Sequence, residues 1–416
     1  MILRFSSSTA QLSTFATLSL ISSGVSAIKA ATYAGMLGPE QFGFYSVFEI
    51  VSAIGLYAGT LGVLDGASRV APILRGQGRA DEAHDLMAQA LGFQLFASAL
   101  GCVVAGGVCL LAGRFDYRVV LLGLTTFATN SLTVASVVAA STGRFRELGL
   151  ISASRSIGTA VLGASAAWSF GITGVLAAEF SIVAMISSWA LWLSPFAIGA
   201  SWPTRRTTAL LFREGLPILL TNVSQFLLRN LERICVGIAV GVDALGQYSF
   251  GSLVLSAAVL VQGICLQFLT PTLAHRRGSG EPFAQALKRV DKYVIRILVG
   301  GLCGYALASA GLSVIERLVN GAYAEGLNLM HVLLLAAVFQ VAQLYPAVFV
   351  SHGQSWRLLH RSMWAGIAGA VACAVGVSGR YDTHYFAWVA VGIRGLALVL
   401  QRADAWNADA SRTITH

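Results

Sequence analysis

Five polar or charged side chains interrupt one apolar stretch of the chain, residues 215–240: Asn222, Gln225, Arg229, Glu232 and Arg233. The first four are spaced three, four and three residues apart, so in a helix they form a stripe along one face. Charges inside a bilayer are costly and normally face a bundle interior or a watery cavity. An arginine guanidinium can bind phosphate oxygens through two parallel hydrogen bonds. The stripe therefore predicts a membrane-buried site for an anionic group such as a pyrophosphate.

A weaker stripe occupies the first apolar stretch, at Ser19, Ser22, Ser26, Lys29 and Tyr33. Each of these residues lies 203 positions before its counterpart in the later stretch, so that Lys29 corresponds to Glu232. We expect the two stretches to be corresponding helices of two half-molecules that share a polar cavity. The substrate-binding residues predicted from both stripes are Arg229, Arg233, Lys29, Glu232, Asn222 and Gln225.

The remaining charges inside apolar stretches are Glu49, Glu179, Arg155 and Arg394. Lys29 precedes Gly38 by nine residues and Glu49 follows it by eleven, which places both at a similar depth on antiparallel helices. A Lys29–Glu49 ion pair is therefore one hypothesis, and a cavity role for each is the other. Glu179 either neutralises a basic residue across the first bundle or carries a coupling proton. Five of the eight buried charges are basic, which suits a pyrophosphate better than a hydrophobic cation.

The composition is that of a polytopic membrane protein. Of the 416 residues 56% are hydrophobic and 11% are charged, with a mean hydropathy of +0.71, whereas a soluble protein has about a quarter charged residues. About 20 apolar residues span a bilayer as a helix, and Tyr345-Pro346 predicts a kink in the tenth span. The sequence predicts an all-α fold of about twelve spans: 12–37, 42–64, 88–113, 119–142, 148–170, 172–197, 215–240, 246–270, 293–315, 328–351, 361–379 and 384–401.

Basic residues outside these spans are distributed unevenly. With the N-terminus in the cytoplasm, 18 Lys and Arg residues fall on the inner side and 4 on the outer side. Cytoplasmic loops carry the excess of Lys and Arg in membrane proteins. We therefore expect both termini to be cytoplasmic.

Two segments repeat along the chain. Gly38-Pro-Glu-Gln-Phe-Gly-Phe-Tyr-Ser46 matches Gly241-Val-Asp-Ala-Leu-Gly-Gln-Tyr-Ser249 at the 203-residue offset, and Ala140-Ser-Thr-Gly-Arg144 echoes Val350-Ser-His-Gly-Gln354. The repeat predicts two six-helix bundles in the same orientation, residues 1–200 and 201–416, with the substrate path between them. In each turn the first glycine suits a helix end with positive φ, and the second allows close helix approach.

Neither the histidines nor the cysteines form a catalytic or metal-binding motif. The seven histidines are scattered, the six cysteines all lie in apolar stretches, and HExxH, GxSxG and zinc-ligand spacings are missing from the sequence. We therefore expect no enzyme activity, no metal, no cofactor and no nucleic-acid partner.

The repeated turns and the seventh span resemble those of a known family. Ala34-Gly-Met-Leu-Gly-Pro-Glu-Gln-Phe-Gly-Phe-Tyr-Ser46, Asn230-Leu-Glu-Arg233 and Gly246-Gln-Tyr-Ser249 are similar to polysaccharide flippases of the multidrug/oligosaccharidyl-lipid/polysaccharide exporter superfamily. The resemblance implies a transporter that moves a polyprenyl-pyrophosphate-linked oligosaccharide across a bacterial inner membrane by alternating access. Its partners would be membrane lipids, a polysaccharide polymerase and glycosyltransferases. Glu232 stands where many members have Asp.

Three alternatives differ in class. A proton- or sodium-coupled multidrug antiporter of the same superfamily would favour abundant acidic cavity residues. A polymerase or ligase acting on the same glycolipids would need a substantial outer loop, and every predicted outer loop is short. A scaffold that transports nothing would leave the paired stripes unexplained.

The charge asymmetry predicts the membrane topology. In a background without native cysteines, single cysteines at Glu40, Asp243 and Glu325 should react with an impermeant thiol reagent in intact cells. Cysteines at Arg79 and Arg277 should react only after permeabilisation. Labelling of residue 79 from outside would refute the orientation.

Overall fold

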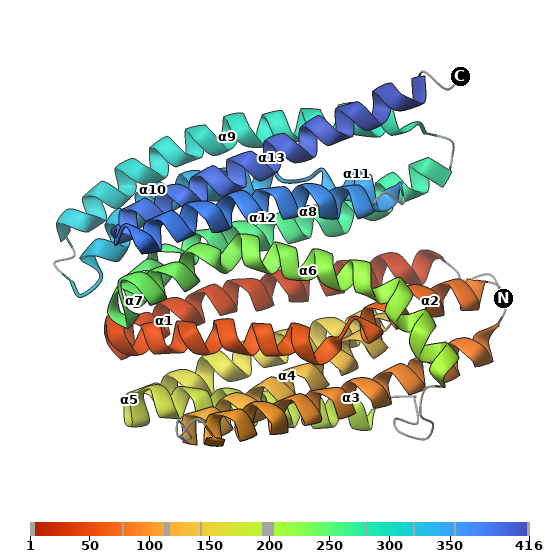
Figure 1. Ribbon diagram of the computed structural model, residues 1–416, viewed down its shortest axis with the longest axis horizontal. Coiled ribbons are helices and arrows are strands. Elements are labelled where there is room, and N and C mark those ends of the chain that lie inside the picture. The colour runs from red at the N-terminus through yellow and green to blue at the C-terminus, as the bar shows by residue number, and fades with distance from the viewer. Residues whose placement is uncertain are drawn as a thin grey trace. The chain divides into compact units, whose positions relative to one another are not determined.

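The computed structural model describes residues 5–76, 79–111, 117–141, 144–193, 204–278, 281–318, 321–352 and 355–413 (Figure 1). The secondary structure in these ranges is helical throughout. The helices are α1 (Phe5–Thr60), α2 (Val63–Gly76), α3 (Ala80–Leu111), α4 (Tyr117–Ser141), α5 (Phe145–Trp192), α6 (Arg205–Ala239), α7 (Val242–Gly251), α8 (Leu253–Gly278), α9 (Phe283–Leu318), α10 (Ala324–Ala342), α11 (Pro346–Ser351), α12 (Ser355–Ser378) and α13 (Thr383–Thr413).

Several of these helices are joined or broken at glycine and proline. Gly38 and Gly171 have positive φ angles of 72° and 57°, so α1 and α5 each consist of two successive helices. Helices α7 and α8 form one span with a 46° bend. The chain breaks between α10 and α11, directly before Pro346, which confirms the predicted kink. If the second part of α1 and α2 are counted as one rod, and likewise α7 with α8 and α10 with α11, the described helices form twelve rods in two sets of six. The predicted all-α fold is confirmed.

Length and apolar composition identify the membrane spans within the described residues. Seven helices are long and apolar enough to cross a membrane, or eight if α7 and α8 count as one span. Large apolar side chains on these helices are exposed, among them Trp168 at 83%, Leu307 at 77% and Val103 at 72%. Exposed apolar surface on this scale is what a lipid-facing protein presents. The chain is a multi-pass membrane protein.

The helices pack into two compact units. One unit contains Met1–Leu37 and Phe48–Leu219, and the other contains Gly38–Val47 and Leu220–His416. The boundary predicted from the sequence repeat, between residues 200 and 201, lies outside the described residues. By packing, the turn at Gly38–Val47 belongs to the second unit, and α6 as far as Leu219 belongs to the first.

Each unit has its own apolar core. In the first unit α2, α3 and α4 pack around Met87, Leu91 and Val134, and α4 lies along α5. In the second unit α10 contacts α7, α8, α9 and α13, with Leu329 and Leu333 fully buried (Figure 1). Two such cores hold the polar stripes of α1 and α6 in fixed surroundings.

The two repeated turns meet within the second unit. Gly38 and Gly241 adopt positive φ, at 72° and 124°, as the helix-end prediction requires. A Cβ atom on Gly43 would lie 1.9 Å from the Val242 carbonyl oxygen, and one on Gly246 would lie 1.9 Å from the Pro39 carbonyl oxygen. The second glycine of each motif is therefore needed for direct backbone contact, as predicted.

Candidate functional site

The polar stripe of α6 reaches two other helices of the second unit. Gln225 Nε2 donates a hydrogen bond to Ser362 Oγ on α12 at 2.9 Å. One turn before Gln225 on the same helix, Asn222 is half-buried. Further along α6, Glu232 contacts α13. The spacing read from the sequence therefore does place polar groups on a helix face that packs inside the unit.

Glu232 and Arg394 form a buried ion pair. Their side chains are 0% and 3% exposed, and Arg394 Nη2 lies 2.8 Å from Glu232 Oε1. The same guanidinium donates to two backbone oxygens, from Nη1 to Ala390 at 3.0 Å and from Nη2 to Arg229 at 3.4 Å. These bonds satisfy part of the buried guanidinium, whereas Arg394 Nε and Glu232 Oε2 have no hydrogen-bond partner among the described residues.

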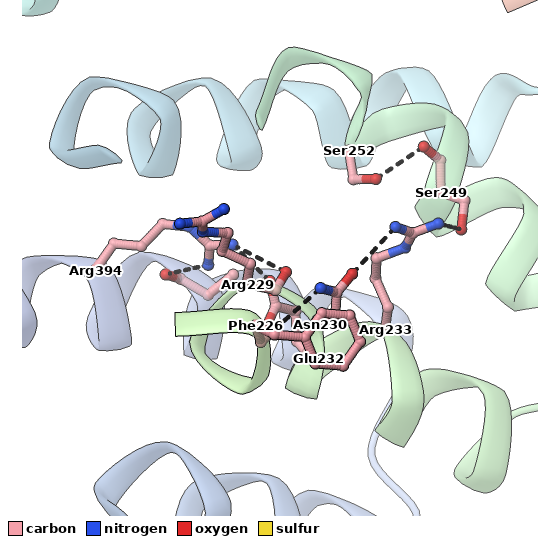
Figure 2. A network of polar contacts seen from close by, with 9 residues as sticks. Phe226, Arg229, Asn230, Glu232, Arg233, Ser249, Ser252 and Arg394 are labelled. Carbon is pink, nitrogen blue, oxygen red and sulfur yellow. Dashed lines mark hydrogen bonds and ion pairs between the residues drawn. The ribbon is translucent and has the colours of Figure 1, made fainter. Parts of the chain in front are cut away.

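Arg229 and Arg233 are half-buried on either side of this pair along α6. Arg233 Nη1 donates to Asn230 Oδ1 and Nη2 to Ser249 Oγ on α7, each at 3.3 Å. Figure 2 shows the Arg394 guanidinium meeting α6 at Arg229 and Glu232, whereas Arg233 turns toward Ser249. The contacts therefore form two neighbouring groups along α6: Arg394 bonds Glu232 and the Arg229 backbone, and Arg233 bonds Asn230 and Ser249.

These groups have an excess of positive charge. Arg229, Glu232 and Arg233 lie on α6, and Arg394 of α13 is paired with Glu232, so these four residues comprise three basic side chains and one acidic side chain. Arginine remains protonated at any physiological pH. Such a balance of charge favours an anion over a cation.

A residue of the break between α10 and α11 is hydrogen bonded to the backbone of Arg394. Gln343 Nε2 donates to the Arg394 carbonyl oxygen at 3.2 Å, and the Gln343 carbonyl oxygen accepts from Gln262 Nε2 at 2.8 Å. Gln340 Nε2 donates to Gln262 Oε1 at 2.7 Å. These bonds satisfy polar groups at the helix break, where unpaired ones would be costly in a membrane.

Lys29 is the charged residue of the α1 stripe, and it forms an ion pair within the first unit. Lys29 Nζ lies 2.7 Å from Glu179 Oε1, and the two side chains are 15% and 11% exposed. The ammonium group also lies 5.4 Å from the ring centroid of Tyr33, a favourable cation–π distance. Tyr33 in turn donates its hydroxyl to the Thr159 carbonyl oxygen at 2.5 Å.

The serines of the α1 stripe are hydrogen bonded to α5. Ser22 Oγ lies 2.9 Å from Ser152 Oγ and 2.7 Å from Ser156 Oγ. Ser26 Oγ lies 3.0 Å from Ser156 Oγ. The polar face of α1 is thus packed against α5, and this arrangement holds the Lys29–Glu179 pair in place.

Lys29 contacts Glu179 on α5, one of the two carboxylates that the sequence suggested as its partner. The other, Glu49, is exposed on α1, and its pairing with Lys29 stays a prediction. The role of Arg394 as the partner of Glu232 was missed by sequence reasoning. The repeat held a signal for it, because Lys29 corresponds to Glu232, and Glu179 and Arg394 both lie in the sixth rod of their sets. The two units therefore carry equivalent ion pairs of opposite polarity.

Comparison with known proteins identifies one family and one fold. The family described as "polysaccharide biosynthesis protein" matches residues 32–313. Comparison with individual curated proteins gives no match.

Solved structures of transporters share the fold over almost the whole chain. A multidrug resistance transporter of the MATE family, in the MOP superfamily and in its inward-facing conformation, matches with a TM-score of 0.73 at 15% identity, covering 98% of this chain and 99% of its own. A MATE transporter mutant from Vibrio cholerae matches with a TM-score of 0.64 at 16% identity, covering 99% and 98%. A MOP-superfamily transporter from Pyrococcus furiosus, described as having a binding pocket of reverse polarity, matches with a TM-score of 0.62 at 16% identity, covering 96% of each chain.

The buried pair of the second unit predicts a stability pattern. Arg394→Met should destabilise the protein by about 3–5 kcal/mol, because it leaves the Glu232 carboxylate buried without its ion pair. The double variant Glu232→Leu/Arg394→Met should recover much of this loss. Thermal melts of the purified protein in detergent measure the effect.

The equivalent pair in the first unit is the control for that measurement. Glu179→Gln should shift the melting temperature independently of the Arg394 variants, since distant sites add. Simple additivity between Glu232→Leu and Arg394→Met would contradict the ion-pair assignment.

Proposed function

Because the chain belongs to the family of polysaccharide biosynthesis proteins and has the fold of MOP-superfamily transporters, we propose that it is a flippase for a polyprenyl-pyrophosphate-linked oligosaccharide. The observation that supports this proposal is the placement of Arg229 and Arg233 on α6 on either side of Glu232, whose carboxylate is paired with Arg394. A pyrophosphate carries several negative charges close together, and arginine forks match phosphate oxygens in geometry.

The arginines take different parts in the proposed binding. Arg394 is directed at Glu232 and holds that carboxylate at 2.8 Å. Arg229 and Arg233 are half-buried and lie four residues apart on α6, so they are the side chains offered to the pyrophosphate. Neutralising Glu232 through Arg394 lowers its repulsion of the incoming anion. The polyprenyl tail would remain in lipid, against apolar faces such as that around Leu307.

Transport would proceed by alternating access, with the two units as the moving parts. The solved relatives include inward-facing and outward-facing conformations, which is the behaviour that this proposal assigns to the chain. The protein would lie in a bacterial inner membrane with both termini in the cytoplasm. It would receive its substrate from glycosyltransferases and deliver it to a polysaccharide polymerase.

A multidrug antiporter is the second candidate, and its support is the carboxylate in the first unit. Glu179 is 11% exposed beside Lys29. If a cationic drug or a coupling ion took the place of the Lys29 ammonium group, the Glu179 carboxylate would be its binding site. The excess of arginine in the second unit speaks against a cationic substrate there. Export of a cationic dye by cells expressing the protein would support this candidate.

The flippase proposal predicts the effect of single arginine replacements. Arg229→Gln and Arg233→Gln remove the charge but keep hydrogen-bonding capacity, so each should reduce export at least tenfold while the protein still folds and inserts. Arg229→Lys should retain partial activity, because the charge remains without the bidentate fork. The measurement is accumulation of lipid-linked oligosaccharide on the cytoplasmic leaflet, normalised to membrane protein level, in cells lacking the wild-type copy.

The matched control is Arg155→Gln. Arg155 also lies within a membrane helix, but it is exposed on α5 and belongs to the first unit. This variant should export at the wild-type rate. Wild-type export by both Arg229→Gln and Arg233→Gln would show that these arginines only pack the bundle.

A further inference from the structure

Helix α9 is the least buried of the seven single-helix spans identified within the described residues. Only 6% of its apolar span is buried inside the protein, whereas the share is 33–67% in the other six. The helix packs mainly against α10 and lies along the edge of the second unit (Figure 1). Most of the surface of α9 is therefore available to the membrane.

Three basic side chains line this exposed face near the beginning of α9. Lys288, Lys292 and Arg296 follow one another at intervals of four residues, and all three are exposed. Residues four apart lie on the same face of a helix. Two apolar side chains of that face, Ile295 and Val299, are 59% and 60% exposed. The α9 basic stripe, which is the name we give to the three cations, thus continues directly into lipid-facing apolar surface.

The carboxylates close to the start of α9 are paired with other cations. Asp291 Oδ1 lies 2.8 Å from Arg402 Nε and accepts a hydrogen bond from the Tyr345 hydroxyl at 2.9 Å. Glu281 Oε1 lies 3.0 Å from Arg289 Nη1. Within the part of the chain that the structure describes, no carboxylate forms an ion pair with the α9 basic stripe. Its three charges are therefore available to an anion from outside the protein.

The equivalent helix of the first unit has no such stripe. The 203-residue offset relates α9 to α3 and places Asp85, Gln89 and Phe93 at the positions of the three cations. The first turn of α3 also carries two acidic residues, Asp81 and Glu82. Membrane orientation requires basic residues on the cytoplasmic side but no particular face of a helix. Orientation alone therefore does not account for the α9 basic stripe.

The length of the stripe matches the depth of a membrane surface. Eight residues separate Lys288 from Arg296, which corresponds to about 12 Å along a helix. One headgroup layer is about 5–8 Å thick, so the stripe extends through this layer to the level at which acyl chains begin. A long basic side chain at that level extends toward the headgroups while its stem remains in apolar surroundings. The anion within reach of all three cations is a lipid phosphate.

We propose that the α9 basic stripe binds the headgroups of anionic phospholipids in the cytoplasmic leaflet, with their acyl chains against Ile295 and Val299. Three cations complement a headgroup of net negative charge, whereas a zwitterionic headgroup brings a cation of its own. A second copy of the chain is a poorer occupant, because a symmetric contact through this face would bring two basic stripes together. The proposal does not depend on the flippase assignment, since no stripe residue belongs to the arginine face of α6.

The experiment compares phosphatidylglycerol with phosphatidylcholine of identical acyl chains. Each lipid is titrated into the purified full-length protein in a neutral detergent, and bound lipid is counted by native mass spectrometry. The wild type should bind phosphatidylglycerol about tenfold more tightly, because each basic residue near an anionic surface strengthens binding roughly fivefold before screening. Added salt should reduce this preference. Equal affinities for the two lipids would overturn the proposal.

Replacement of the three cations tests the site itself. Lys288→Gln/Lys292→Gln/Arg296→Gln should remove the preference for phosphatidylglycerol and leave the affinity for phosphatidylcholine unchanged. Lys288→Arg/Lys292→Arg/Arg296→Lys keeps every charge and should keep the preference. A preference that survives in the glutamine variant would refute the proposal.

The matched control removes the same net charge elsewhere on the predicted cytoplasmic side. Arg79→Gln/Arg213→Gln/Arg357→Gln replaces three arginines that are also exposed, and this variant should bind both lipids as the wild type does. An equal loss in the control and in the glutamine variant of the stripe would show that only net charge matters, and would rule out a site on α9.

Two further measurements separate the lipid from other occupants. The glutamine variant of the stripe should have the same oligomeric state as the wild type by light scattering, and a dimer that it dissociates would make the face a contact between copies instead. Arg229→Gln/Arg233→Gln should keep the preference for phosphatidylglycerol. Loss of the preference in that variant would assign the lipid to the arginine face of α6 and would disprove a site on α9.

Discussion

A charged side chain inside a membrane bundle needs an oppositely charged or hydrogen-bonding partner. This constraint determines which helices are joined by ion pairs in both units. Desolvating a charge costs several kcal/mol, so each of these buried charges forms an ion pair with a residue of another helix. Glu232 of α6 pairs with Arg394 of α13 at 2.8 Å, and Lys29 of α1 pairs with Glu179 of α5 at 2.7 Å. Each pair joins the first rod of its set to the sixth. The polar stripes of α1 and α6 therefore contribute to helix packing.

The two pairs differ in ways that bear on function. In the first unit the cation lies on the first rod and the anion on the sixth, and in the second unit the order is reversed. In the second unit Arg229 and Arg233 accompany the glutamate on α6. Each half thus contains one such ion pair, and the second half has two further arginines beside its glutamate. This asymmetry supports an anionic substrate group held by the second unit.

The sequence predicted best those structural features that depend on residues close together in the chain. Twelve rods follow from apolar length, and the positive φ of Gly38 and Gly241 follows from turns that reverse the chain within a few residues. Proline after Tyr345 marked the break before α11. These features need no knowledge of which helices are neighbours.

Partners of charged residues were harder to predict because they depend on tertiary packing. Depth along a hairpin suggested Glu49 as a partner of Lys29, whereas the 2.7 Å contact of Lys29 with Glu179 joins two helices that are far apart in the sequence. Ser362 and Arg394 lie 137 and 162 residues from their α6 partners, so no local spacing points to them. The sequence repeat could have indicated these partners. It does so only when the charged residues of one half are compared with those at equivalent places in the other half.

The central claim is that the arginine face of the second unit binds the pyrophosphate of a lipid carrier. Its most direct test is the thermal shift of the purified protein with a short-chain polyprenyl pyrophosphate, the matching monophosphate and the neutral polyprenol. The pyrophosphate should raise the melting temperature most, added salt should reduce the increment, and an Arg229→Gln/Arg233→Gln double variant should lose it. An equal shift with the neutral polyprenol, or an undiminished shift in the double variant, would contradict the account.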